Sequence, residues 1–297
     1  MSTADNISTE DEFKNLYPFA SNFHEVGGQK LHYVDEGAGD EILVMVHGNP
    51  TWSFYYRRLI QAFKDTYRVI VPDHIGCGFS DKPQDYPYTL QTHIYNLDSL
   101  LATTGDKKVT LAVHDWGGAI GMGWAIRHPE RVKKIVVFNT AAFLSQRIPF
   151  RINICRIPIF GALAIRGFNA FAGAAIHMAV QKPERLTPAI KAGFLKPYNN
   201  WANRIATLRF VQDIPLHDTH PSYQTLKTID ENLHLFADRP ILIQWGKGDW
   251  CFDLSFYQSW LERFPQAERD LYEDASHYVI EDAHEKIIPR MQKFLQA

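Results

Sequence analysis

Cysteine is scarce in this sequence: three residues, Cys77, Cys155 and Cys251, are spread over 297 positions. That number and spacing exclude a disulfide framework and a zinc site, and they favour free thiols in a reducing compartment, so we expect a cytoplasmic protein. An excess of one charge is also lacking. The net charge of −2 excludes bulk attraction to nucleic acid.

Long apolar runs, internal repeats and low-complexity segments are lacking as well. No run is long enough for a membrane span, and the polar, acidic first residues are not those of a signal peptide. The length suits one large α/β domain with an insertion. Short apolar runs alternate with helical patterns, which predicts a parallel sheet covered on both faces.

The expected elements follow from these patterns. We expect a loosely held arm before about residue 20. Helices are predicted over 57–63, 90–101 and 284–295, and after the turn at 115. Extended segments are predicted over a hairpin at 23–36 and over 41–46, 67–72, 109–115, 134–139, 240–245 and 269–272.

Polar side chains follow the ends of most of these strands. In an open parallel sheet the functional loops lie at the carboxyl ends of the strands. We therefore expect a site assembled there from His47, Asn49, Asp73, Asp115, Asn139, Asp249 and His277.

The stretch from Val109 to Gly118 is the most informative one. An apolar strand ends in Asp115, and Gly117 and Gly118 precede an apolar helical run. This matches the nucleophile elbow of α/β-hydrolases, a sharp turn that lifts one side chain clear of the sheet. Glycine after the raised residue lets the helix pass close to the strand. The alternative is that Asp115 only caps the following helix.

A carboxylate at such an elbow restricts the chemistry. Attack on a carbonyl group would give an anhydride, whereas attack on a saturated carbon gives an alkyl ester that an activated water can open. A serine in that role would form an ether that water could not remove. Asp115 therefore predicts displacement at an sp3 carbon through a covalent ester.

A base and an acid should accompany this nucleophile in the chain order nucleophile, acid, histidine. Of 13 histidines, His277 follows the last strand in a short polar turn and is the expected base. His114 should point away from the site, His47 is expected to be structural, and His284 is expected to be exposed on the last helix. Asp249 follows the penultimate strand and is the expected acid, because Asn139, at the alternative acid position, cannot supply charge.

The leaving group is an anion and needs hydrogen-bond donors. Trp116 offers an indole N–H beside its backbone N–H, and Asn49 offers a side-chain amide, so we predict that the two form an anion-binding pair. The alternatives are a turn role for Asn49 and a packing role for Trp116. No pattern indicates a metal or a cofactor, and we expect none.

The insertion at 144–236 lacks strand patterns and predicts a cap of short helices. The resulting domains are a core from 1–143 and 237–297 with the cap between them. The stretch 157–180 is rich in Ala, Gly and Phe, which favours packing on the core. The alternative is that part of this face makes weak contact with a membrane surface or lines the entry for a lipid-like substrate. In either case an apolar cap favours a hydrophobic small-molecule substrate.

Three segments together resemble the haloalkane dehalogenase branch of the α/β-hydrolases: His47-Gly-Asn-Pro50, Asp73-His-Ile-Gly-Cys-Gly-Phe-Ser80 and His114-Asp-Trp-Gly-Gly118. The resemblance covers essentially the whole chain. It implies Asp115 as nucleophile, His277 as base, Asp249 as acid, and Asn49 with Trp116 as the halide-binding pair. Asn49 argues against epoxide hydrolases, and Trp116 argues against fluoroacetate dehalogenases, which carry arginine there.

Two further segments, 139–143 and 197–216, resemble the cis-β-lactone (3-alkyl-4-alkyloxetan-2-one) decarboxylases of bacterial long-chain olefin biosynthesis, which belong to the same branch. This implies decarboxylation of cis-3,4-dialkyl-β-lactones to cis-alkenes and a complex with other enzymes of olefin biosynthesis. Haloalkane hydrolysis is the alternative activity. A ligand sensor without catalysis is a third hypothesis, which the intact set of Asp115, Asp249 and His277 disfavours.

Overall fold

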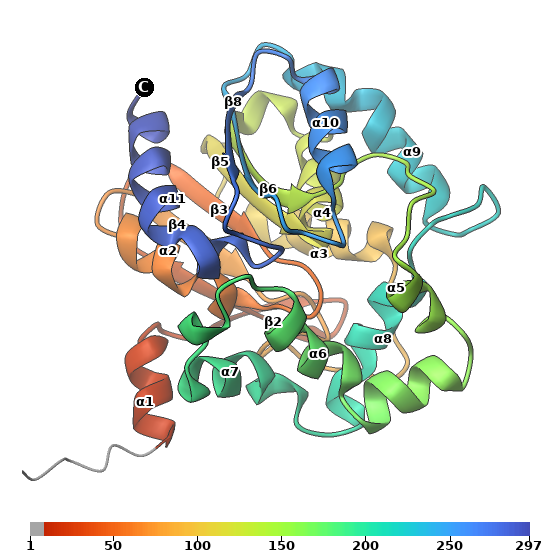
Figure 1. Ribbon diagram of the computed structural model, residues 1–297. Coiled ribbons are helices and arrows are strands. Elements are labelled where there is room, and N and C mark those ends of the chain that lie inside the picture. The colour runs from red at the N-terminus through yellow and green to blue at the C-terminus, as the bar shows by residue number, and fades with distance from the viewer. Residues whose placement is uncertain (1–8) are drawn as a thin grey trace, which may run out of the picture.

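The computed structural model describes residues 9–297, and these form an eight-stranded sheet in the order β1-β2-β4-β3-β5-β6-β7-β8 (Figure 1). The pairs β1–β2 and β2–β4 are antiparallel, and all other neighbouring strands are parallel. The predicted mostly parallel α/β sheet is therefore confirmed. The strands are β1 (Asn22–Val26), β2 (Gln29–Glu36), β3 (Ile42–Val46), β4 (Arg68–Pro72), β5 (Val109–Asp115), β6 (Val132–Thr140), β7 (Ile241–Gly246) and β8 (Glu268–Tyr272).

Both faces of the sheet are buried, as the continuous apolar strands predict. Alternate residues of β3 enter opposite cores, with Val44 and Val46 on one side and Leu43 and Met45 on the other. One core includes side chains of α3 (Leu90–Ala102), α4 (Trp116–Ala125), α9 (Tyr223–Asn232) and α10 (Leu254–Arg263). The other includes side chains of α2 (Arg57–Phe63) and α11 (Val279–Gln296).

The chain between β6 and β7 contains short helices, as predicted for a cap. In Figure 1 most of the helices before α9 lie below the sheet, in green and cyan, whereas α9 lies at the upper right. Helix α9 packs on α3 and α4, and thus against the core. The domain limits at 143 and 236 stay predictions. The other cap elements are α5 (Phe150–Ile154), η3 (Ala162–Gly167), α6 (Ala170–Met178), η4 (Pro183–Arg185), α7 (Pro188–Leu195), η5 (Lys196–Tyr198), η6 (Ala202–Arg204), α8 (Ile205–Gln212) and η7 (Leu233–Phe236).

The prediction of a loosely held arm before about residue 20 is wrong for residues 9–20. Residues 1–8 lie outside the part of the chain that the structure describes. A helix, α1 (Thr9–Leu16), forms instead. Phe13 and Leu16 pack on the core, and Tyr17 is buried with its hydroxyl 2.5 Å from the hydroxyl of Ser53. Phe13 and Tyr17 are four residues apart, so their side chains lie on the same side at the end of the helix. Both rings pack against the ring of Trp52.

The last helix also begins earlier than predicted. It runs from Val279, with a kink at Ala283, so the predicted helix from 284 corresponds to the part after the kink. No helix within residues 9–297 combines the length and the apolar content needed to cross a bilayer.

We expect Phe13→Ala to lower the free energy of unfolding by about 2–3 kcal/mol, because the ring is partly buried against Trp52, Phe54 and Phe79. Urea denaturation followed by tryptophan fluorescence would measure the loss. Asn15→Ala, on the exposed side of the same helix, is the control and should change little. Equal stability of the two variants would show that α1 does not contribute to the fold.

Candidate active site

Asp115 occupies a sharp bend between β5 and α4. Its backbone has φ 52° and ψ −129°, a conformation that side chains other than glycine rarely adopt. The bend also needs small neighbours. A Cβ atom on Gly117 would collide with the carbonyl oxygen of Val46, and one on Gly48 would collide with the Asp115 carboxylate. The local structure is that predicted for a nucleophile elbow, and the Asp115 side chain forms no N-cap hydrogen bond with α4.

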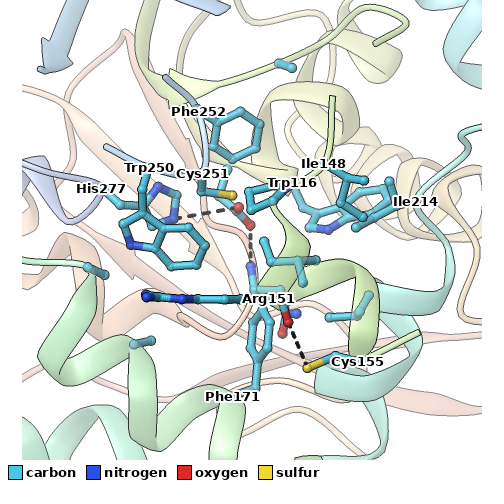
Figure 2. Close-up of a pocket in the computed structure, with 18 of the residues that line it drawn as sticks. Trp116, Ile148, Arg151, Cys155, Phe171, Ile214, Trp250, Cys251, Phe252 and His277 are labelled. Atoms are coloured by element: carbon cyan, nitrogen blue, oxygen red, sulfur yellow. Dashed lines mark hydrogen bonds and ion pairs between the residues drawn. The ribbon is translucent and has the colours of Figure 1, made fainter. Parts of the chain in front are cut away.

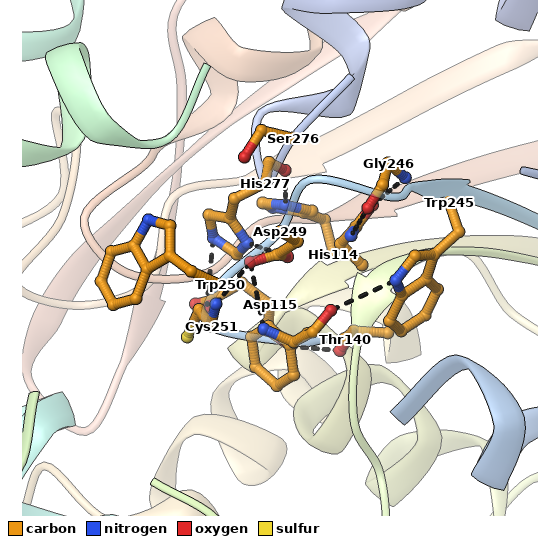
Figure 3. Close-up of polar contacts among 12 residues, drawn as sticks. His114, Asp115, Thr140, Trp245, Gly246, Asp249, Trp250, Cys251, Ser276 and His277 are labelled. Carbon is orange, nitrogen blue, oxygen red and sulfur yellow. Dashed lines mark hydrogen bonds and ion pairs between the residues drawn. The ribbon is translucent and has the colours of Figure 1, made fainter. Parts of the chain in front are cut away.

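The two carboxylate oxygens of Asp115 have different surroundings. Oδ1 accepts a hydrogen bond of 2.6 Å from the backbone N–H of Asn49. Oδ2 lies 3.7 Å from Nε2 of His277 (Figure 3). Burial raises the pKa of the Asp115 carboxyl above its usual value, against the opposing effects of His277 and of the backbone N–H groups of Trp116 and Asn49. One oxygen is thus held in place and the other is directed to the histidine.

His277 and Asp249 form the predicted pair. Nδ1 of His277 lies 2.8 Å from Oδ2 of Asp249, whose Oδ1 accepts hydrogen bonds from the backbone N–H groups of Cys251 and Phe252 (Figure 3). Burial by itself lowers the pKa of His277, but the charges of Asp249 and Asp115 outweigh it and raise the pKa above the usual value. The histidine is therefore oriented by one carboxylate and faces the other.

Asn139, at the alternative acid position, forms hydrogen bonds with the backbone of the neighbouring strand. Its side-chain amide donates to the carbonyl of Gly246 at 3.0 Å and accepts from the N–H of the same residue at 2.8 Å. It joins the carboxyl ends of β6 and β7, from which Asp249 extends.

Three other histidines have structural surroundings. His114 does not line the cavity but lies directly against His277: the ring centres are 4.6 Å apart, and His114 donates from Nε2 to the main-chain carbonyl of His277 at 2.8 Å. Burial lowers the pKa of His114 well below the usual value. His47 is buried, and its ring bonds with Gly48 and His74. His284 is partly buried, so its predicted exposure is wrong: the kink at Ala283 brings the start of α11 against the core.

Asn49 and Trp116 both line the cavity beside Asp115. The Asn49 side chain donates one of its two N–H groups to the carbonyl of Thr207 at 3.1 Å, which leaves the second N–H for a ligand. The indole N–H of Trp116 makes no hydrogen bond with any part of the chain that the structure describes. Two side-chain donors of the cavity lining are therefore available to a ligand, and their role as an anion-binding pair stays a prediction.

The cavity above these residues has a volume of about 290 Å³ and is lined mostly by apolar side chains. In Figure 2, Phe252 lies on the opposite side of the pocket from Phe171 and Cys155, and Trp250 lies beside His277. The cap closes the cavity with Ile148, Ile152, Phe171, Ala174, Ala175, Met178, Val211 and Ile214. Such a lining fits a ligand with alkyl chains.

Several of these contributors escaped sequence reasoning. Trp250, Cys251 and Phe252 directly follow Asp249, and that adjacency was the available signal. Thr140 donates its hydroxyl to the main-chain carbonyl of Asp115, and Thr207 of the cap holds Asn49; no local pattern indicated either contact. Within residues 9–297, no group of three or more His, Cys, Asp or Glu residues could hold a metal ion.

Comparison with known proteins agrees with this geometry. The family model described as alpha/beta hydrolase fold matches residues 41–283. The chain belongs to the α/β-hydrolase fold family.

Within that class, the sequence is similar to proteins of two named activities. It is 47% identical to a cis-3-alkyl-4-alkyloxetan-2-one decarboxylase of Shewanella oneidensis, over 94% of this chain and 89% of the relative. A protein of the same name from Xanthomonas campestris is 44% identical, over 91% of this chain and 93% of the relative. Haloalkane dehalogenase 2 of Mycobacterium tuberculosis is 30% identical, over 92% and 93%.

Solved structures give the same fold. A haloalkane dehalogenase variant from Agrobacterium tumefaciens superposes with a TM-score of 0.83 at 25% identity, covering 94% of this chain and 97% of that one. The predicted resemblance to the haloalkane dehalogenase branch and, more closely, to the lactone decarboxylases is confirmed.

Replacing Asp249 by asparagine should lower the pKa of His277, because only the charge of Asp115 then opposes the effect of burial on the imidazolium. An NMR titration of the histidine ring signals would measure the change, with the His277 signal assigned by its absence in His277→Gln. Asp253→Asn, which changes a carboxylate paired with Arg147, is the control and should leave that pKa in place. An unchanged His277 titration in Asp249→Asn would contradict the pairing.

Proposed function

We propose that this protein decarboxylates cis-3,4-dialkyl-β-lactones to cis-alkenes in long-chain olefin biosynthesis. The observation that carries the proposal is the 47% identity, over 94% of the chain, to a relative named for that activity. The identity to the named haloalkane dehalogenase is much lower, at 30%. The apolar cavity and the buried carboxylate of Asp115 support the same substrate class.

The first step is a displacement by Asp115. Oδ2 attacks the saturated ring carbon that carries the ring oxygen, the C–O bond breaks with inversion, and its electron pair goes to that oxygen. The lactone becomes an alkyl ester of Asp115 with a free carboxylate. Strain in the four-membered ring favours this opening, and the N–H donors of Asn49 and Trp116 receive the developing anion.

The second step releases the products. The bond between the carboxylate carbon and its neighbour breaks, its electron pair forms the alkene, and the Asp115 carboxylate leaves. Carbon dioxide and alkene depart, and no water is consumed. Inversion followed by anti elimination keeps the cis relation of the alkyl groups. A concerted syn elimination would give the same alkene, so product geometry does not distinguish the two routes.

His277 takes part differently in the two candidate reactions. In the decarboxylation, it stabilises the charge of Asp115 across the 3.7 Å separation. In haloalkane hydrolysis, which the dehalogenase relatives favour as the second candidate, it would activate a water that opens the alkyl ester. Asp249 orients the ring in both reactions.

We also propose the cytoplasm as the compartment, since the three cysteines are unpaired. A complex with other enzymes of olefin biosynthesis is a further proposal, supported by the poor water solubility that a dialkyl lactone would have on release.

Offered a cis-3,4-dialkyl-β-lactone, the purified protein should form a cis-alkene, and with a 1-bromoalkane it should release little halide by comparison. Gas chromatography and a halide assay would measure both. Asp115→Asn should reduce alkene formation by about a thousandfold or more, because the amide is a poor nucleophile. Steady halide release without alkene would establish the dehalogenase instead, and no turnover of either substrate would favour a ligand sensor.

The alkyl-enzyme can be trapped with a haloalkane. In His277→Ala the displacement by Asp115 can proceed, but no base activates water, so the ester should accumulate. Intact-mass spectrometry after incubation with a 1-iodoalkane should show one added alkyl group. The double variant with Asp115→Asn is the control and should stay unmodified. An unmodified His277→Ala protein would count against Asp115 as the nucleophile.

A further inference from the structure

Exposed apolar side chains gather on one part of the cap. Of the twelve large apolar side chains that are exposed among the described residues, six lie between 150 and 168, so they are not scattered singly over the surface. Figure 1 shows this segment, in green, along the outer edge of the cap, away from the sheet. We call these six residues and their neighbour Trp201 the cap patch: Phe150, Ile157, Ile159, Phe160, Leu163, Phe168 and Trp201.

The cap patch is a compact structure. Backbone hydrogen bonds from Gly161 to Ile157 and from Phe168 to Leu163 fold the segment on itself. Trp201 joins it through Arg166, whose guanidinium lies 4.6 Å from the centre of the indole ring. The ring of Phe168 is 83% exposed and the side chain of Ile159 is 78% exposed, so the patch offers apolar groups that nothing in residues 9–297 covers.

The chain segment that carries six of the seven patch residues has charges of one sign. Residues 131–183 contain no Asp or Glu, while arginines occur within the cap at 147, 151, 156 and 166. Arg147 pairs with Asp253, but Arg151, Arg156 and Arg166 form no ion pair in the described part of the chain. Apolar side chains beside unneutralised arginines are the combination that binds an anionic lipid surface, where the chains enter the interface and the cations contact headgroups.

The patch adjoins the cavity. Arg151 and Ile152 of α5 line the cavity, whereas Phe150 of the same helix is 77% exposed to solvent. The helix therefore has the cavity on one side and the patch on the other.

We propose that the cap patch docks the protein on an anionic membrane surface, reversibly and without spanning it. The docking relates to the proposed function in one respect: a dialkyl lactone and its alkene both partition into lipid. The binding itself needs only the surface residues of the cap, and its test does not depend on the reaction.

Flotation of the full chain with vesicles tests the proposal. The protein should bind vesicles of mixed phosphatidylcholine and phosphatidylglycerol, bind pure phosphatidylcholine weakly, and lose binding as salt is raised. Phe168→Glu and, separately, Ile159→Glu should weaken binding about fivefold or more, because each adds a repelled charge and removes an apolar contact. Phe23→Glu, on β1, is the matched control at an exposed ring and should bind like the unchanged protein.

Three results would overturn the docking. The first is equal binding to neutral and anionic vesicles, or binding to neither. The second is a loss of vesicle binding in Phe23→Glu as large as that in Phe168→Glu. The third is a dimer, detected by light scattering and dissociated by Phe168→Glu, which would assign the patch to a second copy of the chain. Decarboxylation of a short-chain lactone in buffer is a separate measurement. It should be unchanged in Phe168→Glu, and its absence from the unchanged protein would remove the proposed function without affecting the vesicle result.

Discussion

A carboxylate buried at the end of a parallel strand is the constraint on which the rest of this structure depends. Asp115 is 6% exposed, and a charge in such a place is costly unless hydrogen-bond donors and an opposite charge surround it. The backbone N–H of Asn49 and the ring of His277 meet that need. Two glycines make this close packing possible: a Cβ atom on Gly48 would collide with the carboxylate, and one on Gly117 would collide with the carbonyl oxygen of Val46.

The histidine is held at both ends by groups from different strands. Asp249, beyond β7, fixes the imidazole ring, and His114, within β5, bonds to the main-chain carbonyl of His277. Asn139 ties the ends of β6 and β7 together beneath them. These contacts converge because parallel strands bring their carboxyl ends to one edge of the sheet. The candidate site is therefore a product of the sheet topology as much as of the residues themselves.

The cap determines what such a carboxylate can meet. Displacement at a saturated carbon is common to lactone opening and to haloalkane hydrolysis, so the three residues Asp115, His277 and Asp249 do not separate the two reactions. The cap supplies the apolar walls of the cavity and, through Thr207, holds the Asn49 amide. On its outer side it carries the cap patch, the apolar surface for which we propose membrane docking.

Local patterns in the sequence were enough for the strands, for the bend at Asp115 and for the candidate residues, because apolar periodicity, paired glycines and chain order are local properties. Other features were decided only by tertiary structure. Helix α1 forms part of the fold because Phe13 meets an aromatic cluster built from residues 52–79. The contacts of Thr140 and Thr207 join segments far apart in sequence. Such contacts depend on where the chain returns in space, and no short stretch of residues carries that information.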